Sequence, residues 1–354
     1  MEKIAIVGAG VMGTAVAYPL TDNGFAVNLV GTHLDEAIID SCKDNRFHPR
    51  LKRIIPDAIN PFYISELEQA LQDVSFIVSG VNSNGVRWIG KTLAPYVNTD
   101  TRIIAITKGL EVTTDGELVI LPEVMRAQFP EQVREWVSIA AVGGPCIAGE
   151  LAGRRQSCVY FGSRELDTVT ALRGYFQTDY YHVWTTNDVR SLEIAVALKN
   201  AYALGVGVAA GVLQAAGGVD AADAHMHNLA AALFARGCKE MHLILTALGA
   251  NPEFAYSLPG AGDMYVTAAG GRSVTLGKLM GTGMQYKEAS AQLAGETLEA
   301  AMIIQQMGLA LPAFYAKGIL NQGDLPLMAL LVDMVVNGKK INLRLDDFFN
   351  DVRI

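Results

Sequence analysis

The stretch "KIAIVGAGVMGTAVA", Lys3 to Ala17, decides the fold of this chain. A short β-rich run leads into a glycine-rich turn, and a helical pattern follows at once. Gly8 permits a tight turn, Gly10 lets backbone amides approach a pyrophosphate, and Gly13 allows the helix to pack closely on the strand. The positive N-terminus of such a helix suits a phosphate group. We therefore predict a dinucleotide-binding strand–turn–helix unit at the start of the chain.

Outward from this stretch, short β-rich runs alternate with helical patterns as far as "YYHVWTT" at residues 180–186. This alternation is typical of a doubly wound parallel sheet in an α/β protein. From Asn187 onward the sequence reads as long helical patterns separated by Gly and Pro. We predict a Rossmann-like domain over residues 1–187 and an all-helical domain over residues 188–354. The length of 354 residues also favours two domains.

Composition and charge argue against nucleic acid and a membrane as partners and indicate a reducing compartment. The formal net charge is -8, which leaves no basic surplus for a nucleic-acid backbone. The four cysteines show no CxxC pair, as expected for a protein of a reducing compartment, and we expect a cytoplasmic location. Residues 200–219 carry no charge, but they are rich in Ala and Gly and poor in Leu and Ile, so we expect a buried helix and no membrane span.

The choice of cofactor is left open by the second predicted strand. This strand ends in "NLVGTHLDE", where Gly31, Thr32 and His33 precede the first acid, Asp35. An NAD-specific site usually has Asp or Glu at this point to bind the ribose hydroxyls, and an NADP-specific site has a nearby arginine. Neither is immediately present, so NAD and NADP both remain possible.

Lys199, in "ALKNAYALG", is the one positively charged residue between Leu192 and Val219. A buried, unpaired ammonium costs several kcal/mol, so this lysine needs a partner or a function. Lys108, in "ITKGLE", lies at the end of a predicted strand, the edge at which doubly wound sheets bind ligands. In "LPGAGDMYVTAAGGR", Asp263, Thr267 and Arg272 follow a glycine-rich turn and suit a phosphate or carboxylate group.

Together these stretches resemble the soluble NAD(P)-dependent glycerol-3-phosphate dehydrogenases, above all the bacterial and archaeal members. The resemblance covers nearly the whole chain and runs, in order, through "GAGVMGTAVA", "GTHLDE", "HPRL", "TKGLE", "GPCIAGE", "EIAVALKN", "NLAAALFARGCKEM" and "GAGDMYVTAAGGR". It implies a homodimer that reversibly reduces dihydroxyacetone phosphate to sn-glycerol 3-phosphate with NAD or NADP as cofactor. The product would supply phospholipid synthesis.

The resemblance also implies a role for individual residues. The catalytic residues it implies are Lys199, Lys108 and Asp263. The substrate-binding residues are Asn200, Thr267, Arg272 and Ser273. The cofactor-binding residues are Gly8, Gly10, Val11, Met12, Gly13, Thr32, His33, Lys108, Ala148 and Arg272. Hydride delivery to a ketone creates an alkoxide, and a lysine in a dry site, with Asp263 beside it, can act as its general acid.

Three positions depart from the family pattern. Ser273 replaces the usual Asn, and Ala294 replaces a glutamate that contacts the cofactor. They leave open a dehydrogenase of the same fold that acts on another phosphorylated polyol or ketose; a non-enzymatic nucleotide sensor is a more distant alternative. His227 replaces an aspartate, and together with His225 it is a candidate ligand for a metal ion. Because side chains two residues apart on a helix point in different directions, we expect no metal site there.

Overall fold

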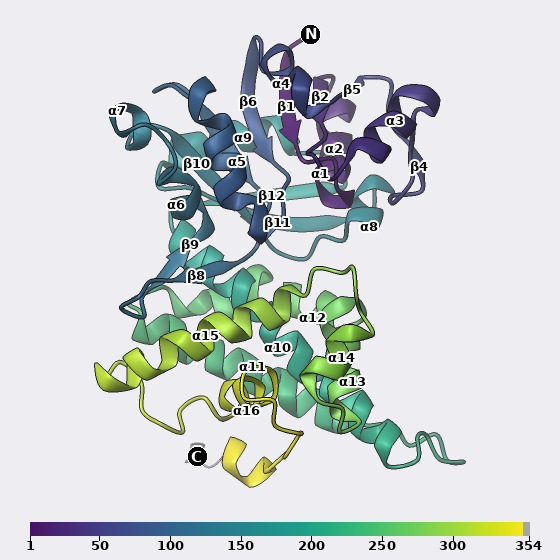
Figure 1. Cartoon of the computed structure of the whole chain (residues 1–354), viewed down its shortest axis with the longest axis vertical. Coiled ribbons are helices and arrows are strands. Elements are labelled where there is room, and N and C mark those ends of the chain that lie inside the picture. The colour runs from purple at the N-terminus through teal and green to yellow at the C-terminus, as the bar shows by residue number, and fades with distance from the viewer. Residues whose placement is uncertain (350–354) are drawn as a thin grey trace. The chain divides into compact units, whose positions relative to one another are not determined.

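The computed structural model describes residues 1–349 and divides into two compact units (Figure 1). Unit 1 comprises Met1–Lys108 and Ile120–Glu193, and unit 2 comprises Gly109–Val119 and the chain from Ile194 onward. The last crossing from unit 1 to unit 2 therefore falls after Glu193, a few residues beyond the boundary that we expected at residue 187. The segment Gly109–Val119 was expected in the first domain, and it packs instead with unit 2.

Unit 1 is built on an eight-stranded sheet with the strand order β12-β11-β10-β7-β6-β1-β2-β5. Its strands are β1 (Lys3–Val7), β2 (Ala26–Val30), β5 (Ile59–Phe62), β6 (Val74–Ser79), β7 (Arg102–Ala105), β10 (Ser138–Gly143), β11 (Ser157–Gly162) and β12 (Tyr181–Thr186). All neighbouring pairs are parallel except β10 and β11, which pair antiparallel with Gly143 opposite Tyr160. The expected doubly wound parallel sheet is therefore confirmed, and the pair of β10 and β11 is an antiparallel exception at which the chain turns back beside β10.

The helices of unit 1 are mostly short and pack on the faces of this sheet (Figure 1). They are α1 (Val11–Ala15), α2 (Ala17–Asp22), α3 (Glu36–Asn45), α4 (Leu67–Ala70), α5 (Val86–Leu93), α6 (Leu121–Arg126), α7 (Glu131–Arg134), α8 (Ala148–Ala152) and α9 (Leu166–Phe176). The short strands β3 (Phe47–His48) and β4 (Arg53–Ile54) form a separate antiparallel ribbon. The side chains of β1 and β2 that face the core are fully buried, as a sheet covered by helices requires.

Unit 2 consists mainly of helices. They are α10 (Val189–Ala215), which begins in unit 1, and α11 (His227–Ala247), α12 (Asp263–Ala268), α13 (Arg272–Gly281), α14 (Tyr286–Ala291), α15 (Glu299–Ala316) and α16 (Pro326–Val335). The helical domain expected from residue 188 onward is confirmed. Unit 2 also contains most of a hairpin formed by β8 (Leu110–Val112) and β9 (Leu118–Ile120), whose β8 strand packs on α15. A Cβ at Gly116 in this hairpin would lie 2.3 Å from the Cβ of Ala313, so only glycine allows the close approach.

The short 3-10 segments and one π-helical turn connect these elements. They are η1 (Ile64–Glu66), η2 (Ser83–Gly85), η3 (Ala94–Tyr96), η4 (Pro252–Ala255), the π turn η5 (Leu258–Gly262) and η6 (Leu345–Phe348). The turn η5 leads directly into α12, so it places the first residues of that helix.

Helix α10 is long and apolar enough to cross a membrane by length and composition, but 78% of its most apolar window is buried inside the protein. It therefore has the burial of a core helix, as its small-residue composition predicted. A second buried feature of unit 2 is the ion pair of Arg236 Nε and Glu240 Oε1, 2.8 Å apart on α11. Glu240 also accepts hydrogen bonds from the main-chain N–H groups of Leu327 and Met328 at the start of α16.

The glycine-rich turn shows why its three glycines differ. Gly8 has a φ of +117°, a conformation that glycine adopts without strain. A Cβ at Gly13 would lie 2.1 Å from the carbonyl oxygen of Gly8, so α1 and the end of β1 meet backbone to backbone. A Cβ at Gly10 would meet nothing within 4 Å, and its φ is -65°. Gly13 is thus required for packing, and Gly10 faces open space.

We expect Gly13→Ala to destabilise the protein by at least about 3 kcal/mol, because overpacking against main-chain atoms cannot relax as a side chain would. Gly10→Ala is the matched control, since the same methyl group enters open space. The free energies of unfolding in urea should differ between the two variants. Equal stability of Gly13→Ala and the wild type would contradict this account of the turn.

Candidate functional site

The carboxyl edge of the sheet in unit 1 gathers most of the residues predicted to bind a dinucleotide. Gly8, Gly10 and Gly13 form the turn after β1, and Val11 and Met12 open α1. Ala148 is the first residue of α8, which packs on α1. Thr32 and His33 follow the carboxyl end of β2, the parallel neighbour of β1. The structure therefore brings these residues to one edge.

This edge has the features that a dinucleotide needs. The position above Gly10 is open, so a pyrophosphate could approach the main chain there. Helix α1 has no side-chain cap at its N-terminus, so its first N–H groups need acceptors. An anion at this end is also favoured by the helix dipole. The residues present fit a nicotinamide dinucleotide.

The main-chain N–H and carbonyl groups of Ala9, in the glycine-rich turn, are each held by a side chain. Asp35 Oδ2 accepts a hydrogen bond from the main-chain N–H of Ala9 at 3.2 Å. His48 Nε2 lies 2.9 Å from the carbonyl oxygen of Ala9, and His48 Nδ1 accepts from Leu51 N at 2.9 Å. Burial lowers the pKa of His48, so the ring is neutral at pH 7 and donates from Nε2. Sequence reasoning missed the function of Asp35 and His48, because both act on a residue that is distant in sequence.

Lys108 follows β7 at the same carboxyl edge and is half-buried. Its Nζ donates a hydrogen bond to the carbonyl oxygen of Gly144, at 3.3 Å, just after β10. The neighbouring parallel strands β7 and β10 thus place this lysine against the segment after β10, which carries the "GGP" sequence.

Glu193 is an unexpected member of unit 1. It is 0% exposed, and neither of its carboxyl oxygens has a hydrogen-bond partner. Burial raises the pKa of this carboxyl to about 8, and the positive charge of Lys108 lowers it in part. The signal in the sequence was present in "EIAVALKN", where an acid stands among apolar residues, but only the structure shows that the acid is unpaired.

In unit 2 the structure answers the question raised by the charge of Lys199. Its Nζ lies 2.8 Å from Asp263 Oδ1 and donates a hydrogen bond to Thr267 Oγ1 at 2.6 Å. The side chains of Lys199 and Asp263 are only 6% and 3% exposed. Asp263 is the first residue of α12, and Thr267 lies one turn later and donates to the Asp263 carbonyl. Three predicted residues from α10 and α12 therefore form one cluster, in which Lys199 and Asp263 are buried and Thr267 is half-buried.

Of the other predicted substrate residues, Asn200 and Ser273 are buried, whereas Arg272 is exposed. Asn200 is 8% exposed beside Lys199, and Ser273 is 7% exposed in the first turn of α13. Arg272 is the first residue of α13 and is exposed to solvent. Its guanidinium pairs with Glu299 at 2.9 Å and with Glu296 at 3.5 Å. Exposed ion pairs of this kind contribute little free energy, so an anionic ligand can displace them.

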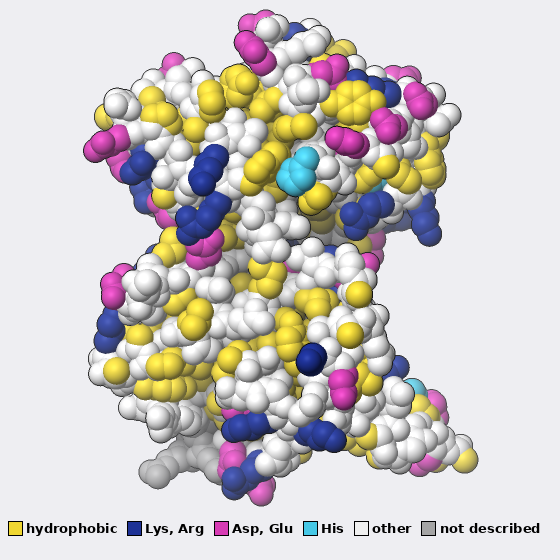
Figure 2. All heavy atoms as spheres, in the orientation of Figure 1, with side chains coloured by type: hydrophobic (Ala, Val, Ile, Leu, Met, Phe, Trp, Pro, Cys, Tyr) yellow, Lys and Arg dark blue, Asp and Glu magenta, His cyan; other side chains and the backbone are white. Residues whose placement is uncertain are grey.

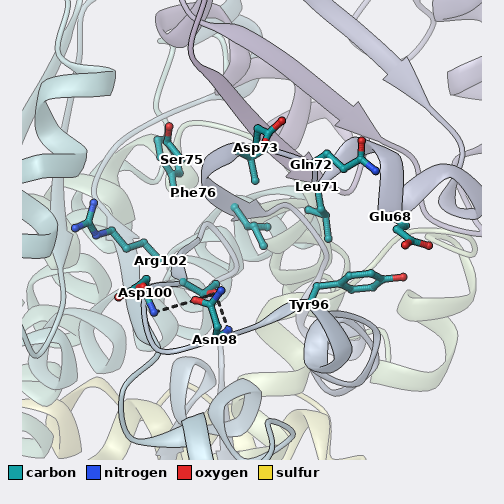
Figure 3. Close-up of a pocket in the computed structure, with 13 residues that line it drawn as sticks. Glu68, Leu71, Gln72, Asp73, Ser75, Phe76, Tyr96, Asn98, Asp100 and Arg102 are labelled. Atoms are coloured by element: carbon teal, nitrogen blue, oxygen red, sulfur yellow. Dashed lines mark hydrogen bonds between the residues drawn. The ribbon is translucent and has the colours of Figure 1, made fainter.

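The cavity drawn in Figure 3 lies at the other edge of the sheet, beside the amino ends of β6 and β7. It measures about 390 Å³, and Tyr96, Asn98, Asp100 and Arg102 are among its lining residues. None of the predicted cofactor or substrate residues lines it. It is therefore separate from the predicted dinucleotide edge.

The two histidines considered as metal ligands stack on each other with ring centroids 4.9 Å apart. His225 Nε2 also lies 3.1 Å from Asp223 Oδ1, on an exposed turn. Within residues 1–349, no group of three or more His, Cys, Asp or Glu side chains is placed to hold a metal ion.

Comparison with known proteins gives matches to both parts of the chain. Residues 3–168 match the family model "NAD-dependent glycerol-3-phosphate dehydrogenase N-terminus", and residues 188–345 match the corresponding C-terminus. An NADP(+)-dependent glycerol-3-phosphate dehydrogenase of Archaeoglobus fulgidus is 32% identical over 290 residues, 82% of this chain and 83% of that protein.

Two further comparisons agree. A glycerol-3-phosphate dehydrogenase [NAD(P)+] of Oceanobacillus iheyensis is 32% identical over 295 residues, covering 83% of this chain and 80% of that protein. The crystal structure of glycerol-3-phosphate dehydrogenase from Coxiella burnetii has a TM-score of 0.77 at 23% identity and covers 96% of both chains, which shows the shared fold.

We expect Lys199→Met to lower the free energy of unfolding by about 3–5 kcal/mol, because it leaves the Asp263 carboxylate buried without its partner. Adding Asp263→Asn should restore much of that loss, since the buried charge is then removed. Urea unfolding of the two single variants and the double variant forms a double-mutant cycle. Strictly additive effects would contradict a direct interaction.

We expect Glu193→Gln to stabilise the protein increasingly as pH rises. Glu193 has a pKa of about 8 when folded and an ordinary value of 4.5, so ionisation opposes folding between these values. The penalty grows by at most about 1.4 kcal/mol per pH unit, is absent well below pH 4.5 and levels off above pH 8. Thermal unfolding at pH 5 and pH 8 checks this, with the exposed Glu68→Gln as control. A stability gain that is equal at both pH values would count against it.

Proposed function

This chain belongs to the NAD-dependent glycerol-3-phosphate dehydrogenase family, and we propose that it catalyses the NAD(P)-dependent reduction of dihydroxyacetone phosphate to sn-glycerol 3-phosphate. Both family models match, and together they cover most of residues 3–345. The observation that carries the proposal in the structure is the buried cluster of Lys199, Asp263 and Thr267. The reaction is reversible, so the same groups would serve glycerol phosphate oxidation.

The chemistry requires a proton at one defined atom. When bound, NADH or NADPH supplies a hydride to the carbonyl carbon of the substrate. The carbonyl oxygen then needs a proton, and Lys199 is the ammonium that we assign to this step. Asp263, 2.8 Å away, stabilises the charged lysine inside the apolar helix, and Thr267 fixes its direction. Protein side chains thus hold the proton donor before the substrate arrives.

Lys108 and Arg272 are proposed to orient the substrate and cofactor. A guanidinium binds a phosphate through two parallel hydrogen bonds, which an ammonium cannot do. Arg272 would exchange its contacts with Glu296 and Glu299 for the substrate phosphate, and Ser273 and Asn200 would contribute polar groups beside it. Lys108, held by the Gly144 carbonyl, would lie at the cofactor edge.

From the resemblance we also propose a cytoplasmic homodimer that supplies glycerol phosphate for phospholipid synthesis. A second candidate function is the reduction of a different ketose phosphate. It is favoured by Ser273, which is buried in the first turn of α13 next to Arg272 where the family usually has Asn. A shorter side chain there leaves more room beside the proposed phosphate site.

We expect purified protein to oxidise NADH or NADPH when dihydroxyacetone phosphate is added, and much less with unphosphorylated dihydroxyacetone. The variant Lys199→Met with Asp263→Asn should fold but lose at least about 10²-fold in kcat, the usual size of a lost acid contribution. Absorbance at the nicotinamide band measures the rate.

The matched control is Lys239→Met, the same change at an exposed position of α11. It should keep the wild-type rate. Faster turnover of another ketose phosphate would favour the second candidate. A folded double variant with near-native kcat would show that the assigned proton donor is wrong.

A further inference from the structure

Two carboxylates already occupy Arg272, the arginine that we assign to the substrate phosphate. Its Nη2 donates to Glu299 Oε1 at 2.9 Å, and its Nη1 donates to Glu296 Oε2 at 3.5 Å. The side chain of Arg272 is 42% exposed, so a ligand can reach the guanidinium as well as these acids do. One positive charge therefore faces two negative charges before any ligand arrives.

Both acids come from one short segment of unit 2, "LAGETLE" at residues 293–299, which joins α14 to α15. Glu296 lies in an exposed turn, where the preceding Gly295 has a φ of +88° and its Cβ position would meet nothing within 4 Å. Glu299 is the first residue of α15 and is half-buried. The turn leaves Glu296 room to move, whereas the helix fixes the main chain of Glu299.

Few other cations accompany Arg272. Between residues 258 and 299 the sequence holds two more, Lys278 and Lys287, against four acids. On the face of unit 2 that Figure 2 draws, Lys and Arg side chains are few and scattered over the helices that Figure 1 labels α12, α13, α14 and α15. An anion at the start of α13 therefore depends mainly on Arg272, and the contacts of this arginine with the two acids decide how strongly the anion binds.

Binding of a phosphate group at Arg272 is an exchange of ion pairs. Exposed ion pairs stabilise a protein little, because each carboxylate regains its hydration when it is released. Glu299 also keeps a favourable interaction after release, since the positive N-terminus of α15 favours an acid in its first turn. The released Glu296 lies on the exposed turn and faces water. Both contacts can therefore be broken by a ligand.

The contacts nevertheless reduce the amount of protein that is ready to bind. While a carboxylate holds Arg272, the guanidinium cannot offer both of its parallel N–H groups to a phosphate. The acids belong to the same chain, which gives them an effective concentration on the order of millimolar or more. The apparent affinity for an anion is reduced by the fraction of molecules in which Arg272 is released. This reduction is the same for every anion that binds through the guanidinium.

We propose that Glu296 and Glu299 form an autoinhibitory contact, in which they compete with the phosphate group of the substrate for Arg272 and lower the affinity of every anion there by one common factor. The inference rests on the part of the proposed function in which Arg272 binds that phosphate. Because the product carries the same group, the return of the carboxylates to Arg272 also assists product release. The two acids thus set how tightly substrate and product are held.

Modification of Arg272 by phenylglyoxal in the full chain, followed on its peptide by mass spectrometry, measures the released guanidinium and needs no turnover. We expect the double variant Glu296→Gln with Glu299→Gln to raise the modification rate about 5-fold, equivalent to about 1 kcal/mol for the two exposed contacts together. Each single variant should give a smaller rise. Glu299→Gln should give the larger of the two, because its contact is the shorter one.

Protection of Arg272 by two anions measures the competition itself. The phosphomonoester sn-glycerol 3-phosphate carries about two negative charges near pH 7, and the carboxylate D-glycerate carries a single one. At constant ionic strength, the concentration of each anion that halves the modification rate should fall by the same factor of about 5 in the double variant. Simple repulsion by the two acids would instead act more on the doubly charged anion.

The matched control is Glu288→Gln, which removes the same charge from an exposed position in the first turn of α14. It should leave the modification rate of Arg272 unchanged. Arg102, an exposed arginine of unit 1 at the amino edge of the sheet, serves as the internal reference in every variant (Figure 3). Its rate should be the same throughout.

The inference is overturned if Arg272 reacts at the wild-type rate in the double variant, if Glu288→Gln produces the same rise, or if the gain in protection follows the charge of the anion. It is also overturned if neither anion protects Arg272 in any variant. The proposed reaction is tested separately by turnover. A protein whose Arg272 responds as expected, but which does not reduce dihydroxyacetone phosphate, would retain the inference and contradict the assigned reaction.

Discussion

The cost of removing charged groups from water is the constraint on which both units of this protein depend. In unit 2, Lys199 and Asp263 are both almost fully buried and lie 2.8 Å apart, so neither charge is tolerated without the other. Arg236 and Glu240 meet the same requirement at a second place, and Glu240 also accepts two main-chain N–H groups of α16. The Lys199–Asp263 pair thus joins α10 to α12, and the hydrogen bonds that Glu240 accepts join α11 to α16.

The carboxylates of this protein differ in their burial and in their partners. Asp35 is buried and satisfied by three donors, so it acts as a brace of the glycine-rich turn. Glu296 and Glu299 contact Arg272 at the surface, where water screens the charges and the contacts can be exchanged. Glu193 is buried without a partner and costs stability at neutral pH. Its place in the unit that holds Lys108 agrees with the general tendency of strained or perturbed groups to gather near functional sites.

The glycine-rich turn of unit 1 uses two of its glycines for opposite purposes. Gly13 is needed because a side chain would collide with the Gly8 carbonyl, whereas Gly10 borders open space that a ligand can enter. The first is a packing constraint that acts on the fold, and the second is an absence of packing that leaves room for a pyrophosphate. One sequence motif therefore combines a structural requirement and a binding requirement, which explains why its spacing is so informative.

The sequence by itself determined the alternating strands of unit 1, the glycine-rich turn and the helical character of unit 2, because hydrophobic period and glycine spacing are local properties. It also singled out Lys199, since a lone charge in an apolar helix is visible without coordinates. Tertiary structure alone decided the antiparallel pairing of β10 with β11, the place of the β8–β9 hairpin in unit 2, and the partners of Lys199, Asp35 and His48. These depend on contacts between residues far apart in the chain, whose cost or benefit appears only when the groups leave water together.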